Sequence, residues 1–142
     1  FGAMLSKAPA NVTETLTTFG EKLGVVFQLA DDVIDIASDS VQSGKTPGTD
    51  LREGVPTLVT LQVMKSKRSE DQPLQELLSR PLNDDEAKAM IVTLRSHSAL
   101  QEAREKLHAM AREARALLAP LPDIAARRAF EALCDAVVER TA

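Results

Sequence analysis

An acidic cluster inside an apolar segment is the part of this sequence best suited to chemistry. Residues 24–37 read GVVFQLADDVIDIA, and they carry Asp31, Asp32 and Asp35 with Gln28 just ahead of them. Carboxylates this close repel one another, and a buried carboxylate without a partner costs free energy. Carboxylate oxygen is the ligand that Mg²⁺ prefers, usually one or two protein carboxylates with waters and phosphate oxygens. The cluster therefore predicts a site for Mg²⁺ and a phosphate-bearing ligand.

Helical spacing places these polar residues on one side of the segment. With Gln28 set at zero and about 100° per residue, Asp35 lies at roughly −20°. Asp32 and Asp31 lie at roughly +40° and −60° on the two sides of it. Gly24 falls on the same side and leaves room one turn earlier. The other positions are apolar, which predicts a central, mostly buried helix. A solvated acidic face on a surface helix is the alternative at this point.

A glycine-rich segment follows, SGKTPGTDLREG at residues 43–54. Lys45 stands between two glycines, and a lysine on such a loop could contact a phosphate. A nucleotide-binding P-loop is excluded, because that motif requires glycine at the position of Asp39. An EF-hand is excluded as well, because the acidic residues do not alternate around a central glycine. The sequence predicts a polar loop over residues 38–54.

The elements that must position these residues are helices. The chain has four Phe, no Trp or Tyr and six Gly, which argues against an all-β domain. Asn83 with Glu86, and Ser98 with Gln101, match the capping-box pattern, and Asp123 is placed to cap the last helix. The sequence predicts helices over residues 12–37, 56–66, 73–80, 83–97, 98–119 and 123–140. The last of these are joined by short turns and should pack antiparallel.

Composition narrows the function further. The chain of 142 residues is about the size of one domain. Its net charge is −4 without a long basic run, which argues against a nucleic-acid partner. The single Cys134 excludes an internal disulfide and favours a cytoplasmic location. No apolar run reaches about 18 residues, so we expect no membrane span. His97 and His108 are separated by a break at Ser98 and are not predicted to share a metal.

Together the acidic helix and the following loop resemble a known family. Residues 19–58, FGEKLGVVFQLADDVIDIASD…SGKTPGTDLREGVPTL, resemble the second aspartate-rich region of trans-polyprenyl diphosphate synthases. That family has roughly F-G-x-x-x-G-x-x-F-Q-x-x-D-D-x-x-D followed by G-K-x-x-G-x-D-L-x-x-G-x-x-T-L. The residues that match are Phe19, Gly20, Gly24, Phe27, Gln28, Asp31, Asp32, Asp35, Gly44, Lys45, Gly48, Asp50, Leu51, Gly54, Thr57 and Leu58. This joint match is far more specific than DDxxD alone.

The resemblance implies a fold and a reaction. The fold would be all-α, the C-terminal half of the isoprenoid synthase helical bundle, which in the family is typically a homodimer. The enzyme would condense isopentenyl diphosphate with an allylic diphosphate and release pyrophosphate, with Mg²⁺ assisting ionisation. Asp31 and Asp32 would hold the metal with support from Asp35. Gln28 and Lys45 would be the catalytic and diphosphate-binding residues.

Departures from the family pattern limit this expectation to half of a site. The first aspartate-rich motif is absent, and the other aspartate pair, DDEAK at residues 84–88, has Lys88 where the third aspartate should be. We interpret that pair as a solvated helix start. Residues 1–142 are therefore expected to be the C-terminal part of a synthase whose N-terminal half is absent, and inactive alone. The alternative is a non-catalytic regulatory subunit of a heteromeric prenyl synthase. A terpene cyclase ranks lower because GKTPGTDL is a synthase feature.

Overall fold

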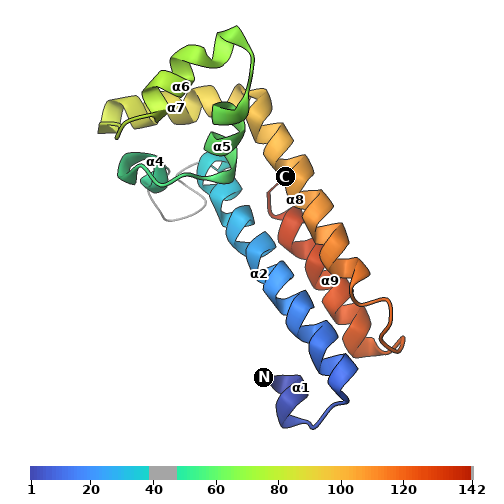
Figure 1. The fold of residues 1–142 in the computed structure, drawn as a ribbon. Helices are drawn as coiled ribbons and strands as arrows, with labels where there is room; N and C mark the ends of the chain where they lie inside the picture. The colour runs from blue at the N-terminus through green and yellow to red at the C-terminus, as the bar shows by residue number, and fades with distance from the viewer. Residues whose placement is uncertain (39–47, 142) are drawn as a thin grey trace. The chain divides into compact units, whose positions relative to one another are not determined.

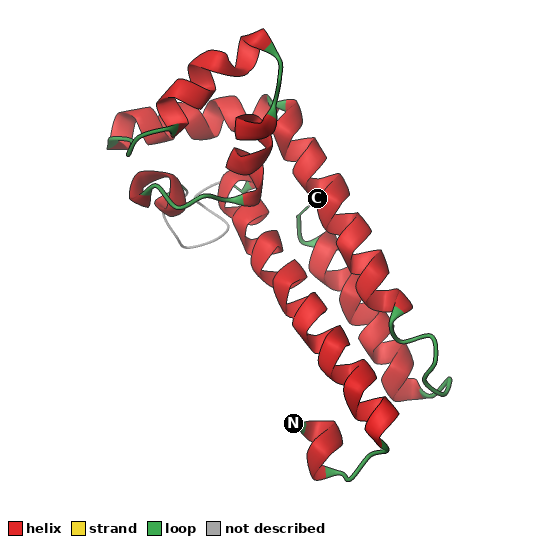
Figure 2. Cartoon of the chain, viewed as in Figure 1, coloured by secondary structure: helices red, strands yellow, loops and turns green. Residues whose placement is uncertain are grey.

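Helices account for the regular secondary structure in the part of the chain that the computed structural model describes, residues 1–38 and 48–141 (Figure 2). The expected all-α class is confirmed. The helices are α1 Gly2–Leu5, α2 Ala10–Ala37, α4 Thr49–Glu53, α5 Leu58–Lys65, the 3₁₀ turn η1 Ser69–Asp71, α6 Gln72–Leu78, α7 Asp84–Ser96, α8 Ser98–Ala116 and α9 Ala125–Glu139 (Figure 1). Within the described residues, none of these helices is long and apolar enough to cross a membrane.

The chain divides into two units, and α2 and α8 each contribute to both. Residues 1–30 and 107–140 form the first unit, in which α9 runs antiparallel to the end of α8 (Figure 1). Helical spacing aligns its core on α2, α8 and α9, and the Phe19 and Phe130 rings lie 5.3 Å apart. Its buried residues are Phe19, Leu23, Val26, Ala30, Leu107, Ala111, Ala114, Leu118, Cys134, Val137 and Val138. The interpretation of Cys134 as a core residue is thus confirmed.

The second unit, residues 31–106 with Thr141, contains the acidic end of α2 and helices α4 to α7. Val33 and Ile36 of α2 are fully buried here. The other buried apolar residues are Leu51, Leu58, Val59, Val63, Leu82, Ala87, Met90, Ile91, Leu94, Ala99, Leu100 and Ala103. This apolar packing fixes the end of α2 against the helices that follow it in the sequence.

Of the three N-caps predicted for the last helices, one is confirmed and two are wrong. The Asn83 side chain accepts the Glu86 N–H at 2.9 Å, and Glu86 accepts the Asn83 N–H at 3.0 Å, so this capping box forms. At α8 the cap is His97, whose Nδ1 accepts the Ala99 N–H at 3.1 Å, because Ser98 is already helical. At α9 the cap position is Ile124, and Asp123 instead pairs with a guanidinium.

Two other expectations need correction. The segment predicted to be a loop ends in a short helix, α4, which begins after Gly48. Helix α2 is not buried on all sides, because Val25 and Phe27 are 51% and 46% exposed in this chain. Val25 and Phe27 lie on opposite flanks of the acidic stripe, the side of α2 that carries Asp31, Asp32 and Asp35. The apolar pattern correctly located the core side of α2, but it cannot tell which apolar residues of the helix are buried within this chain.

Candidate functional site

The three aspartates lie on the last turns of α2, where the helix enters the second unit. Asp31, Asp32 and Asp35 are each half-buried, so they project neither into bulk water nor into the core. Gln28 precedes them on the same helix, and its side chain is exposed. Lys45 lies outside the described residues. Of the predicted site residues, the structure therefore groups the three aspartates on one helix end and places Gln28 one turn before them.

Asp32 contacts the beginning of α5. Its Oδ2 accepts the N–H of Leu58, the first residue of that helix, at 3.3 Å. Thr57 and Thr60 form a capping box that fixes this helix start. The first N–H groups of a helix lack intrahelical partners and carry partial positive charge, so they favour a carboxylate. The start of α5 thus holds one oxygen of Asp32 in place.

Asp35 is held in a similar way by Gly48. Its Oδ2 accepts the Gly48 N–H at 3.0 Å. Gly48 has φ +76°, in the left-handed region, and a Cβ there would lie 2.4 Å from Cδ1 of Ile91. Glycine is favoured for both reasons, since other residues are strained at this φ and a Cβ would force the end of the Ile91 side chain to move. Close contact between α7 and Gly48 thereby brings a backbone donor to Asp35.

The glycine at this position can be tested by substitution. In the full-length protein, Gly48→Ala should lower the free energy of unfolding by about 2–4 kcal/mol, from left-handed strain plus the Ile91 clash. Gly54→Ala is the matched control, because Gly54 has φ +68° but a Cβ there meets nothing within 4 Å. It should lose only the strain energy, about 1–2 kcal/mol. Urea denaturation measures both, and equal losses would show that the Ile91 contact does not matter.

Negative charges gather around Asp32. The pKa of Asp32 is raised above its usual value, chiefly because burial disfavours the charged form. The Leu58 N–H opposes this effect, while the charges of Asp50, Asp31 and Asp35 add to it. Asp50 is in the first turn of α4, and its position beside Asp32 was not anticipated from the sequence. Because four carboxylates share this field, a cation placed there would be stabilised.

The carboxylates do not form a closed metal cage. Among the described residues, no group of three or more His, Cys, Asp or Glu side chains is arranged to hold a metal ion. Asp32 and Asp35 each use one oxygen to accept a backbone N–H. Mg²⁺ is usually bound by only one or two carboxylates, with water and phosphate oxygens as the other ligands. The donor set therefore fits a cation whose shell is completed by a phosphate ligand.

The second aspartate pair has a different environment. Asp84 and Asp85 begin α7, and their side chains are 78% and 96% exposed. Asp84 pairs with Arg52 at 2.9 Å, and Asp85 pairs with Lys88 at 3.6 Å. The interpretation of this pair as a solvated helix start is confirmed.

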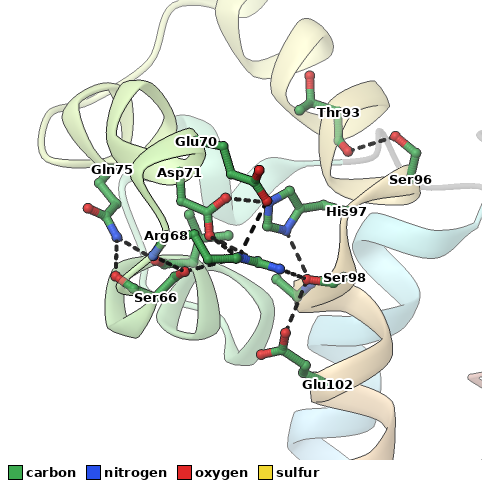
Figure 3. A network of polar contacts seen from close by, with 12 residues as sticks. Ser66, Arg68, Glu70, Asp71, Gln75, Thr93, Ser96, His97, Ser98 and Glu102 are labelled. Atoms are coloured by element: carbon green, nitrogen blue, oxygen red, sulfur yellow. Dashed lines mark hydrogen bonds and ion pairs between the residues drawn. The ribbon is translucent and has the colours of Figure 1, made fainter.

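A network of polar contacts around the buried Asp71, not predicted from the sequence, connects the α5–α6 segment with the α7–α8 junction (Figure 3). The Asp71 side chain is 1% exposed and lies 2.9 Å from Nε2 of His97 and 2.9 Å from the Arg68 guanidinium. Because Nδ1 of His97 accepts a backbone N–H, Nε2 carries the proton and donates it to Asp71. Hydrogen bonds from Ser66 first, then His97 and Arg68, lower the pKa of Asp71 to about 2.

No local sequence signal marks this network. Asp71 lies in the polar run SKRSEDQ, which reads as a loop, and His97 is 26 residues further along. The prediction that His97 and His108 share no metal is compatible with these contacts, because His97 is engaged by Asp71 on one ring nitrogen and by the backbone on the other. Its role is to join two segments.

Comparison with known proteins places the chain in a family. The sequence profile of the polyprenyl synthetase family matches residues 1–94. A nonaprenyl diphosphate synthase from Mycobacterium tuberculosis is 42% identical over 98% of this chain and 42% of its own length. An octaprenyl diphosphate synthase from Escherichia coli is 32% identical over 88% of this chain and 39% of its own length. The chain thus spans about two-fifths of the length of these relatives.

Solved structures agree with the sequence relatives. A geranylgeranyl pyrophosphate synthase from Corynebacterium glutamicum, complexed with calcium and isoprenyl diphosphate, matches with a TM-score of 0.86 and 33% identity. The match covers 99% of this chain and 44% of that one. A polyprenyl synthase from Caulobacter crescentus CB15, with the same ligands, gives 0.85 and 29%, over 99% and 44% of the two chains. By profile, sequence identity and fold, this chain belongs to the polyprenyl synthetase family.

Proposed function

We propose that the protein containing this chain is a chain-elongating prenyltransferase. It condenses isopentenyl diphosphate with an allylic diphosphate and releases pyrophosphate. The observation that carries the proposal is the acidic end of α2, where Asp32 is half-buried in the field of three other carboxylates. The printed names of the relatives, and the calcium and isoprenyl diphosphate in two of the solved neighbours, support a divalent cation and a diphosphate here.

Each residue of the proposed site has its own role in binding. Asp31 and Asp32 would hold Mg²⁺, directly or through water, and Asp35 would support them. The bound ion would offset the negative charge that develops on the leaving pyrophosphate. Gln28, exposed one turn earlier, is proposed to contact the allylic substrate, and Lys45 the diphosphate. The N–H groups of Leu58 and Gly48 prevent the carboxylates of Asp32 and Asp35 from turning away.

The reaction places two further demands on the protein. The allylic carbon–oxygen bond breaks with its electron pair leaving on pyrophosphate, and the isopentenyl double bond attacks the allylic cation to form the new carbon–carbon bond. The cation that results loses a proton, for which the released pyrophosphate is an available acceptor. Chemistry of this kind requires exclusion of water and a second wall around the substrates. We therefore propose that residues 1–142 supply one wall and are inactive alone. A cytoplasmic homodimer is the proposed form of the complete protein.

Pyrophosphate release tests this function. In the full-length protein with isopentenyl and allylic diphosphates, Asp31→Ala should lower turnover by about 10²–10³-fold, because a metal ligand supplies several kcal/mol of charge stabilisation. Chelation of Mg²⁺ should abolish turnover, and added Mg²⁺ should restore it. Asp85→Ala is the control, since Asp85 is a 96% exposed member of the other aspartate pair. Unchanged turnover in Asp31→Ala would count against the proposal.

A further inference from the structure

The carboxyl end of α2, just after the aspartates, is bound by a residue from α7. Nε of Arg95 donates to the Ile36 carbonyl at 2.9 Å, and Nη2 of Arg95 donates to the Ser38 carbonyl. The last carbonyls of a helix have no intrahelical donors and carry partial negative charge. A guanidinium presents several N–H groups in a rigid planar fork, so one side chain can serve two of these carbonyls. Arg95 therefore caps α2 from a helix 59 residues away in sequence.

The same helix reaches Asp35 by a second route. Ile91 lies one turn before Arg95 on α7 and packs directly against Gly48. The Gly48 N–H in turn binds Asp35. Helix α7 thus affects the final turn of α2 in two ways. Arg95 binds the backbone carbonyls that follow Asp35. Ile91 packs against Gly48, whose N–H binds the Asp35 carboxylate.

From these contacts we propose that Arg95 is a positioning residue for the acidic end of α2. By holding the Ile36 and Ser38 carbonyls, it keeps the last turn helical and so keeps Asp35 in register with Asp32. This inference rests on the proposed function, because it concerns the carboxylates that would bind a cation with a diphosphate. Arg95 acts through α2, since its guanidinium donates to two backbone carbonyls.

The alternative, that Arg95 only adds stability, predicts a different result. A merely stabilising contact would lower the melting temperature of the protein and leave ligand affinity per folded molecule unchanged. A positioning residue should change the local opening of the final turn of α2 and the affinity of the site together. Two measurements on the full-length protein separate these roles.

The first measurement is hydrogen exchange in the metal-free protein, read by mass spectrometry on peptides covering residues 31–38. Arg95→Gln should accelerate exchange there by about tenfold, because the last turn opens more often. Arg95→Lys keeps the charge but lacks the fork, and should fall between Gln and the wild type. Arg112→Gln is the matched control, since Arg112 is exposed on another helix, α8, and should change nothing.

The second measurement is calorimetric titration with inorganic pyrophosphate in the presence of Mg²⁺. The dissociation constant should rise about tenfold in Arg95→Gln and less in Arg95→Lys, as is typical when a group that orients metal ligands is removed. The thermal midpoint of each variant is recorded alongside. If Arg95→Gln does not fold, the exchange and the pyrophosphate affinity of Arg95→Lys, each compared with the wild type, decide the question.

The outcomes distinguish this inference from the function on which it rests. Unchanged exchange over residues 31–38 in Arg95→Gln overturns the capping role. Faster exchange with unchanged pyrophosphate affinity overturns the positioning role. If the wild type itself binds no pyrophosphate with Mg²⁺, both the proposed function and the positioning role of Arg95 are contradicted. If the wild type and both Arg95 variants bind pyrophosphate equally well, the positioning role of Arg95 is contradicted and the proposed function is not.

Discussion

In the full-length protein, Asp32→Asn is expected to lower prenyl transfer by about 10²–10³-fold without lowering the stability of the metal-free protein. Asparagine has the shape of aspartate, and its Oδ1 can still accept the Leu58 N–H. It cannot supply the negative charge that a cation requires. Loss of function without loss of stability is the expected signature of a residue whose charge serves a ligand and not the fold.

The sign of the stability change follows from the raised pKa of Asp32. A raised pKa means that the folded protein binds this proton more tightly than the unfolded chain does. The stabilisation from protonation is present below the unfolded pKa and is lost as pH rises through the folded pKa. At neutral pH the ionised Asp32 therefore opposes folding, and its neutral isostere should match or slightly exceed the wild type.

Two measurements on Asp32→Asn decide the matter. Steady-state pyrophosphate release gives the rate, and thermal denaturation in the presence of a chelator gives the stability of the metal-free protein. Asp85→Asn is the control for loss of one aspartate charge and should change neither quantity. A melting temperature that falls together with the rate would show that Asp32 is needed for folding and would contradict a role in binding.

Asp71→Ala is expected to produce the largest loss of stability, with a melting temperature lower by on the order of 5–10 °C. The substitution leaves His97 and Arg68 without the buried carboxylate that both contact. Removing the buried carboxylate is strongly destabilising, because His97, only 15% exposed, loses its carboxylate partner and Arg68 loses its ion pair with Asp71. The affected contacts join the α5–α6 segment to the start of α8 (Figure 3).

Glu70→Ala is the control for this substitution. Glu70 is the neighbouring residue, is 76% exposed, and lies 3.8 Å from the same Arg68. An exposed pair of this kind contributes little, so the melting temperature should stay within about 1–2 °C of the wild type. Equal effects of Glu70→Ala and Asp71→Ala would contradict a special role for the buried carboxylate.

The effect of Asp71 should also depend on pH. The pKa of Asp71 is lowered to about 2, well below the usual value for an aspartate, so the folded state favours the ionised form. The stabilisation is fully present above the unfolded pKa and is lost as pH falls through the folded pKa. The difference in melting temperature between wild type and Asp71→Ala should therefore shrink between about pH 4 and pH 2.

The sequence by itself determined the helices, the core side of α2 and the family. Each of these depends on local information. Apolar spacing at 3.6 residues identifies a helix and its buried side, and Asn83 with Glu86 marks a helix start three residues apart. The acidic stripe is equally local, because its members share two turns of one helix. The matched residues between 19 and 58 then indicated the family, which the comparisons confirmed.

Local information also explains the errors. Ser98 matches a capping box, yet His97 is the N-cap residue, because Ser98 is already helical and Nδ1 of His97 accepts the Ala99 N–H. Asp123 forms an ion pair with Arg128 at 2.7 Å and does not cap α9. The apolar pattern of α2 predicted a mostly buried helix, whereas Val25 and Phe27 are exposed in this chain. Periodicity reports where apolar residues lie, and only packing decides what covers them.

Only the tertiary structure decided how the aspartates are held. The donors to Asp32 and Asp35 come from residues 26 and 13 positions later, and the cap on α2 comes from Arg95, 59 positions later. No spacing rule connects residues so far apart, because their approach depends on how α4, α5 and α7 pack against the end of α2. Sequence therefore predicted which side chains carry the charge, and packing determined which backbone and guanidinium groups keep them in place.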